Sequence, residues 1–237
     1  MHGIPFRRPT RERLVRSLFL FLTGWLFCAV PCGYGEEATD PCGAKLKELR
    51  KLSFLALAIP AGVKESPEQR KFLLAVEQFI KQVPAGHEAA KAPAHYVRGR
   101  YFLRRKNAPA ARADFDAALR VPDAGGVAAS VAHEIPWFPT LSTIQVFRAF
   151  TFLGDGVGAV LSKLEEIPAD ASPPSYHEVG DLLNRWAEEL GNKEQFDEAI
   201  RVYGVIQRLH LWEDEGDEPS RRVELLKVQR DGRRQAP

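Results

Sequence analysis

The stretch Ala94–Pro122, AHYVRGRYFLRRKNAPAARADFDAALRVP, decides the fold of this chain of 237 residues. Small and large apolar residues recur in it at the spacings that lock two short antiparallel helices together. Such a helix pair cannot bury its apolar face alone, so it stacks on neighbouring pairs. The stacked surface of these arrays typically binds a protein or peptide. The stretch therefore predicts a helical repeat that holds a partner.

The rest of the chain from Gly43 onward also reads as helix, because the alternation of apolar and polar residues typical of half-buried strands is absent. Some helix starts are legible: Ser66-Pro67-Glu68 offers an N-cap, a first-turn proline and an early acid, and Ser175 and Glu178 have capping-box spacing. The sequence predicts an all-α domain. The expected helices are 44–58, 67–82, 88–105, 109–120, 139–153, 156–166, 175–190, 193–209 and 218–230.

Four of the expected helices end in a β-branched residue followed by proline, a combination that stops a helix. Their prolines are separated by 24, 38 and 46 residues, so a repeat here has drifted, unequal units. The alternative is that these are unrelated helix stops. The four pairs are Ile59-Pro60, Val83-Pro84, Val121-Pro122 and Ile167-Pro168.

The N-terminus has the order of a secretory signal. Residues 1–16 carry five arginines and one glutamate, and the uncharged run Ser17–Pro31 follows. This run is shorter than the roughly 20 residues of a membrane span. We expect cleavage after Gly35. The predicted organisation is a signal peptide at 1–35, a linker at 36–43, a repeat domain at 44–230 and a disordered tail at 231–237.

Two alternatives to this cleavage stay open. Cys32 is a candidate lipidation site, and Leu18–Val30 is a candidate for an uncleaved anchor if it tilts or extends. Each alternative keeps the domain outside the cytoplasm. The expected location is therefore periplasmic or otherwise extracytoplasmic, with membrane attachment only through this N-terminal segment.

The charge balance of the expected mature chain differs from that of the whole sequence. The whole chain has 33 basic and 31 acidic side chains, of which residues 1–35 hold five and one, leaving 28 and 30. A net charge of −2 predicts no nucleic-acid partner. Of the three cysteines only Cys42 would remain, so an internal disulfide framework is not available. Cys42 is then an unpaired thiol near a loose terminus or a link between chains.

The spacing of small and aromatic residues in Ala94–Pro122 resembles the tetratricopeptide repeat family, whose unit is a helix pair of about 34 residues. Glycine and alanine allow the helices to approach, and the aromatic residue fills the adjacent gap. His95 and Arg98 stand where the family usually has large apolar residues, which leaves the register of that helix open. The matching residues are Gly99, Phe102, Ala111, Phe115, Ala118 and Pro122, one place early.

A second unit matches with fewer exceptions in Asp181–Leu211, and a degenerate unit is suggested in Phe147–Pro168, with Gly154 and Gly156 at its turn. The segment around Pro84 also looks like envelope proteins of the family. The resemblance implies an irregular α-solenoid of helical hairpins, closed by a capping helix at 218–230. An ordinary helical bundle is the alternative. The second unit rests on Leu183, Trp186, Ala187, Leu190, Phe196, Ala199, Ile200, Tyr203 and Ile206.

The same resemblance implies which side chains face a binding groove. Basic residues would lie in the first unit and acidic residues in the last, so that a peptide with an acidic and a basic part would be complementary. Trp137, in a loop between two prolines, is a further contact candidate or a plug over the core. For the candidate groove residues on the helices, the alternative is that they simply belong to solvated helix faces. The candidate partner-binding residues are Tyr96, Arg100, Leu103, Arg104, Trp137, Asp181, Asn184 and Glu188.

Motifs for an enzyme are nearly absent. His133-Glu134 begins a pattern like that of a zinc helix, but Phe138 stands where the second histidine is needed. Acidic neighbours such as Glu165-Glu166 and Glu213–Glu215 read as solvated surface. We therefore expect no catalytic residue, no cofactor and no metal. The sequence favours an exported adaptor that binds another envelope protein; a carbohydrate- or wall-binding domain and an envelope hydrolase remain alternatives.

Overall fold

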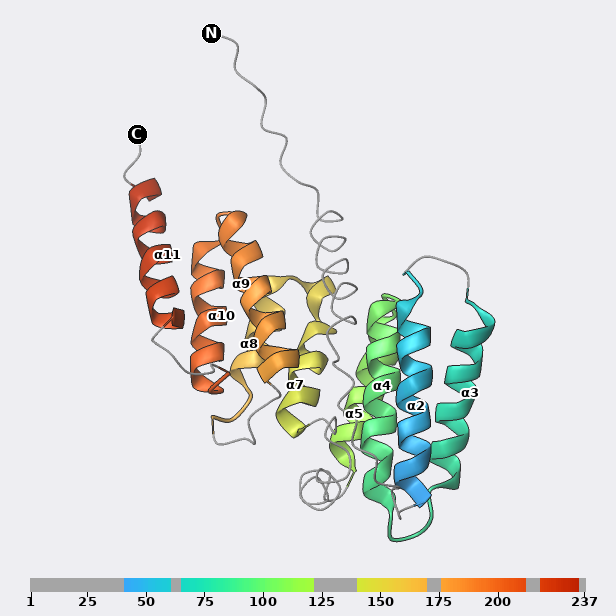
Figure 1. The fold of residues 1–237 in the computed structure, drawn as a ribbon. Helices are drawn as coiled ribbons and strands as arrows, with labels where there is room; N and C mark the ends of the chain where they lie inside the picture. Colours follow the sequence, from blue (N-terminus) through green and yellow to red (C-terminus); the bar gives the residue numbers. More distant parts are fainter. Residues whose placement is uncertain (1–40, 61–64, 122–139, 170–175, 212–217, 235–237) are drawn as a thin grey trace.

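The computed structural model describes residues 41–60, 65–121, 140–169, 176–211 and 218–234 (Figure 1). Every regular element in those ranges is helical, which confirms the all-α class for the described part of the chain. The leader, Trp137, His133-Glu134 and Glu213–Glu215 lie outside it. The helices are α2 (Pro41–Ala58), α3 (Pro67–Gln82), α4 (Lys91–Arg104), α5 (Ala108–Arg120), α7 (Leu141–Phe150), α8 (Val157–Glu165), α9 (Asp181–Asn192), α10 (Phe196–Arg208) and α11 (Glu218–Arg234).

Helices that follow one another in sequence pack as pairs. The pairs are α2 with α3, α4 with α5, α7 with α8 and α9 with α10, and α11 packs on α10. Successive pairs are joined by contacts of α4 with α2 and α3, of α5 with α7, and of α8 with α10. The pairs therefore follow one another in chain order, with α3 at one end of the row and α11 at the other (Figure 1).

The four helix ends predicted from the proline pairs are confirmed. The helices α2, α3, α5 and α8 end at Ala58, Gln82, Arg120 and Glu165, each just before one of the four proline pairs. Val83 and Val121 have ψ angles of 123° and 124°, outside the helical range, because the proline ring that follows crowds helical backbone. The predicted start of α3 is also confirmed: Gln69 N donates to Ser66 Oγ at 3.2 Å and Ser66 N donates to Gln69 Oε1 at 3.1 Å.

Several helix boundaries differ from the sequence prediction. The expected helix 88–105 divides into a 3-10 turn, η2 (Glu88–Ala90), and α4. The expected helix 139–153 ends at Phe150, and a 3-10 turn, η3 (Leu153–Asp155), leads to Gly156. Gly156 has a φ of 108°, a backbone angle that favours glycine and that stops the helix there. α2 begins at Pro41 and α11 extends to Arg234.

The interface of α4 with α5 has the close approach that the sequence predicts. A β-carbon built on Gly99 would lie 2.7 Å from Cε1 of Phe115, a distance that no real β-carbon tolerates. Ala111 and Ala118 are fully buried beside Phe115. His95 and Arg98 lie inside α4, so the register of this helix is continuous through them.

The α4–α5 and α9–α10 pairs turn in the same way. Lys106 and Glu194, 88 positions apart, have left-handed φ angles of 61° and 64° just after the first helix of each pair. In each turn the next residue donates its N–H to a carbonyl five residues back: Asn107 to Phe102 and Gln195 to Leu190, both at 2.9 Å. These are Schellman motifs. The offset of 88 also aligns Gly99 with Ala187, Ala111 with Ala199 and Phe115 with Tyr203.

Candidate functional site

The candidate residues of α4 divide into core and polar positions. Tyr96 and Leu103 are buried, with 2% and 4% of their surface exposed. Arg100 and Arg104 are one helical turn apart on the same face. Tyr96 packs edge-on against Phe147 of α7, with ring centroids 5.6 Å apart. The two aromatic rings therefore form an apolar floor beneath Arg100.

Arg100 forms an ion pair with Glu178, which lies 78 positions further along the chain. Glu178 belongs to η4, a π-helical turn at Tyr176–Gly180 that leads directly into α9. The guanidinium of Arg100 lies 4.8 Å from the ring centroid of Phe147. Burial is the largest single effect and lowers the pKa of Arg100, but the charges and hydrogen bonds of Glu178 and Tyr96 together outweigh it and hold the pKa above its ordinary value. Arg100 is thus a neutralised, fixed cation.

Arg104 lies in a different environment, although it is only one turn away. Only 7% of its surface is exposed, and its Nε and Nη1 atoms have no hydrogen-bond partner among the described residues. Burial and the neighbouring charge of Arg100 lower the pKa of its guanidinium. An unsatisfied buried charge is costly, so each such group calls for an explanation. An anionic ligand that accepts from these atoms would supply one.

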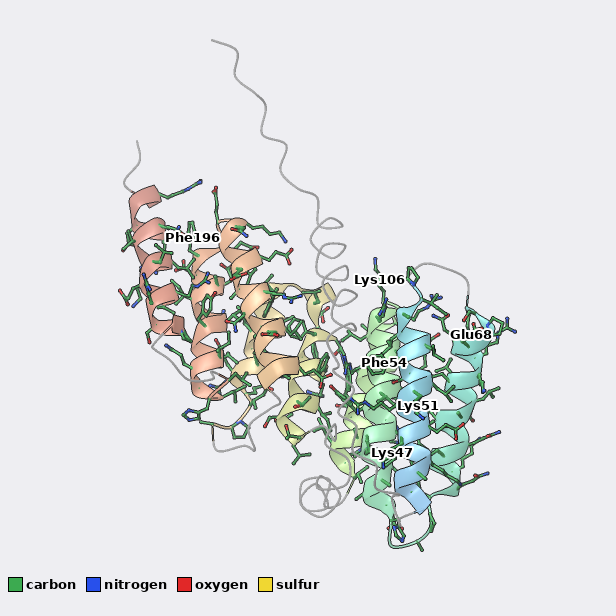
Figure 2. The ribbon with its side chains drawn as sticks, in the orientation of Figure 1. Lys47, Lys51, Phe54, Glu68, Lys106 and Phe196 are labelled. Carbon is green, nitrogen blue, oxygen red and sulfur yellow. The ribbon has the colours of Figure 1, made fainter. Side chains whose placement is uncertain are left out.

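Arg50 brings a third guanidinium from α2, the helix that packs against α4. Burial lowers the pKa of Arg50, and the charge of Glu178 opposes this effect. Glu178 therefore acts on both Arg50 and Arg100. Lys47, Lys51 and Phe54 follow one another along α2, as Figure 2 shows, and their spacing of three and four residues puts them on the same helical face as Arg50. We call Arg50, Arg100 and Arg104 with Glu178 the arginine cluster.

The candidate residues of α9 continue from the acidic side of this cluster. Asp181 and Asn184 are half-buried, and Glu188 is exposed. Glu188 accepts from Arg222 of α11, with 3.3 Å between Arg222 Nη1 and Glu188 Oε1. Glu178 lies in η4 and Asp181 is the first residue of α9, and of these two acidic residues Glu178 is the one that contacts an arginine of the cluster. Trp137, the remaining candidate, is outside the described residues.

A second polar cluster lies inside the α4–α5 interface. Arg98 donates to Asp114 through Nε and Nη2, at 2.8 and 2.6 Å. His95 Nδ1 lies 2.8 Å from Oδ1 of the same carboxylate. At the corresponding positions of α9–α10 the chain has Leu183, Trp186 and Val202, all buried. One hairpin thus joins its helices with an ionic cluster where the other uses apolar side chains.

The acidic pair Glu165-Glu166 noted in the sequence is engaged in ion pairs on the surface. Glu165 accepts from Arg201 through both oxygens at 2.8 Å, and Glu166 accepts from Lys163. The arginine hydrogen bonds lower the pKa of Glu165. Within the described ranges, no three histidine, cysteine or acidic side chains gather as a metal site. Cys42 lies in the first turn of α2 and is buried in the core.

Three residues of these clusters, Glu178, Arg50 and Asp114, were not predicted as site residues from the sequence. Glu178 was read as part of a capping box, whereas its carboxylate contacts Arg100. Arg50 lies on a polar face of α2 that no motif marks. Asp114 carries no signal of its own, and His95 and Arg98 in apolar positions left only the register of that helix open. An acid placed sixteen and nineteen residues later on the facing helix is the pattern that would have found it.

Comparisons with known proteins return no match: no family model, no curated protein and no solved structure matches this chain. Among the helices that the structure describes, none is both long and apolar enough to cross a membrane.

Proposed function

We propose that this protein is an exported, non-enzymatic scaffold of tetratricopeptide-like helical hairpins, which binds an acidic segment of another protein of the cell envelope. The observation that carries the proposal is Arg104, whose buried guanidinium has two donors without a partner among the described residues. The arrangement of the helices supports a repeat, because pairs stack in chain order and two of them share the same turn.

The arginine cluster favours an anionic ligand over a cationic one. Arg100 is already neutralised by Glu178, so Arg104, with help from Arg50, is the group that would donate hydrogen bonds to a carboxylate of the ligand. A charge-assisted hydrogen bond of this kind contributes roughly 1.5–3 kcal/mol. Lys47 and Lys51 would attract the same segment before it docks. The sequence predicts a basic part of the ligand near Glu188, which lies on the exposed side of α9.

The proposed export rests on residues 1–35, with their basic start and uncharged run. Cleavage after Gly35 would release the domain, lipidation at Cys32 or an uncleaved anchor would tether it, and each outcome leaves the arginine cluster outside the cytoplasm. Mass spectrometry of the N-terminus of the protein isolated from cell envelopes distinguishes the three. Recovery of an unprocessed chain in the cytosolic fraction would contradict export.

Binding is tested with a fluorescein-labelled peptide of alternating glutamate and serine, and a matched peptide of lysine and serine. We expect fluorescence anisotropy to show binding of the acidic peptide alone, weakening as salt is raised. Arg104→Gln is expected to weaken it by about tenfold, which corresponds to 1.4 kcal/mol. Arg120→Gln, which removes an exposed arginine from α5, is the control. Equal affinity of Arg104→Gln and the unmodified protein would refute the site.

The natural partner is identified by crosslinking in intact envelopes followed by mass spectrometry. A crosslinked protein is the partner that we propose only if its recovery falls in the Arg104→Gln strain and not in the Arg120→Gln strain. The crosslinked peptide should carry a run of acidic residues. A partner recovered equally in both strains would show that binding occurs elsewhere on the protein.

A further inference from the structure

Large apolar side chains that stay exposed in the described part of the chain gather at its two ends. Leu55 and Leu74 are 57% and 59% exposed on α2 and α3, and Leu225 and Val228 are 55% and 69% exposed on α11. Figure 1 shows α3 and α11 at opposite ends of the row of helices. Exposed apolar groups concentrated in this way mark contact surfaces rather than general surface composition.

The N-terminal end carries a groove between α2 and α3. Leu52 and Leu74 lie in it, with Glu48 toward one end and Arg70 toward the other. Leu55 follows Leu52 by one helical turn and extends the apolar strip. The groove lies between two antiparallel helices, which is the shape that receives a third helix.

The C-terminal end presents a ridge. Leu226 is the inward-facing residue of α11 and lies 3.2 Å from a β-carbon built on Gly191. On the outer side, exposed residues recur at intervals of four, three and four: Arg221, Leu225, Val228 and Gly232. This spacing places them along one stripe of the helix.

The packing within the chain indicates what covers the groove. Each later pair is contacted by the second helix of the pair before it, since α5 packs on α7 and α8 packs on α10. In the described part of the chain, the α2–α3 pair has no preceding helix of this kind, and α11 has no following pair. We propose that the outer stripe of α11 in one copy docks into the α2–α3 groove of a second copy, head to tail.

Length and charge suit this docking. Arg221 to Gly232 and Pro67 to Gln78 both contain twelve residues, and the distance between their ends is roughly 16 Å along the helix. With α11 parallel to α2, Arg221 lies next to Glu48, and Asp231 lies next to Arg70 at the other end. Arg70 contacts Glu65 only at 3.8 Å and is 62% exposed, so it is accessible to a second copy. These rim charges set the direction of the docked helix.

Such a contact joins two different surfaces, so it is heterologous and adds copies in an open row. The surface involved is that of one helix in one groove, which belongs to the class of small, transient interfaces. The proposal is independent of the arginine cluster, because none of its residues takes part. Loss of acidic-peptide binding would leave it untouched.

Sedimentation velocity of the purified protein over a concentration series tests it. We expect the average mass of the unmodified protein to rise with concentration. Leu74→Glu places a charge in the groove, and Val228→Glu places a charge on the ridge. Each variant alone should therefore remain a monomer. An equimolar mixture of the two should form pairs and nothing larger, because each supplies the surface that the other lacks. Ala113→Glu, on an exposed position of α5, should behave as the unmodified protein.

The direction of docking is tested by charge exchange. Glu48→Arg is expected to lower the self-association constant by about threefold, a typical effect of one exposed ion pair. Glu48→Arg combined with Arg221→Glu should restore it. A protein that stays monomeric throughout, a mixture that forms no pairs, or a Val228→Glu variant that still self-associates would each overturn the proposal. Retention of folding in every variant is confirmed by circular dichroism, which these exposed substitutions should leave unchanged.

Discussion

Arg98 and Asp114 hold α4 to α5 at the two positions that Trp186 and Val202 occupy in the α9–α10 pair. The Asp114 side chain is 6% exposed and accepts three contacts, two from Arg98 and one shared with His95. Both oxygens of the Asp114 carboxylate therefore have partners. Its loss would leave the half-buried Arg98 without a counter-charge.

Asp114→Val should destabilise the protein by about 3–5 kcal/mol, the usual effect of breaking one side of a buried ion pair. Replacement of the whole cluster by its counterparts in α9–α10, with His95→Leu and Arg98→Trp added, should recover most of this loss. Urea unfolding of the two variants checks it. A triple variant no more stable than Asp114→Val would show that the two hairpins are not equivalent at this position.

Arg104→Met should raise the stability of the protein. Burial and the charge of Arg100 lower the pKa of Arg104, so the charged side chain opposes folding at neutral pH. Methionine keeps the apolar stem and removes the unsatisfied donors, with an expected gain of roughly 1–2 kcal/mol. Thermal unfolding measures it, with Arg120→Met as control. A lower melting temperature would indicate that Arg104 has a structural partner.

Tyr96→Phe should change how the stability of the protein depends on pH above about pH 10. Burial raises the pKa of Tyr96 well above its ordinary value of 10.0. A group whose pKa is higher in the folded than in the unfolded protein contributes stability below the unfolded value, and this contribution is lost as pH rises. The unmodified protein should therefore lose stability faster than Tyr96→Phe above about pH 10. Parallel curves of melting temperature against pH would contradict this.

Lys106→Gly and His210→Gly should each stabilise the protein. Both residues have left-handed φ angles, 61° and 50°, at the end of a helix. Any side chain with a β-carbon is strained there, and relief of the strain outweighs the added freedom of glycine in the unfolded chain by about 1 kcal/mol. Urea unfolding measures the gain. Lys106→Ala, which keeps the β-carbon, should give none.

The sequence was sufficient for the elements whose signals are local. The proline pairs predicted the ends of α2, α3, α5 and α8, because each acts on the residue directly before it. The contact of Gly99 with Phe115 was also predictable, since both residues belong to one hairpin and repeat at helical spacing. The end of α7 at Phe150 was missed because an apolar pattern continues through Phe152 and Leu153 into η3.

The arginine cluster was only half predictable. The repeat pattern placed Arg100 and Arg104 on one face of α4, but it gave them the same role. The structure separates them, because Glu178 neutralises Arg100 and leaves Arg104 buried next to it. No local pattern relates residues 78 positions apart. Pairing at that distance is a property of how the hairpins curve around one another, which sequence spacing does not contain.

The Arg100–Glu178 pair also has a mechanical meaning. A row of hairpins joined only to its neighbours behaves as a spring, whose ends bend apart at little cost. The Arg100–Glu178 ion pair joins α4 directly to the turn before α9, two helix pairs that are separated in the chain by the α7–α8 pair. The pair therefore restrains how far α4 and the start of α9 can separate, and because both side chains are largely buried, salt screens it little.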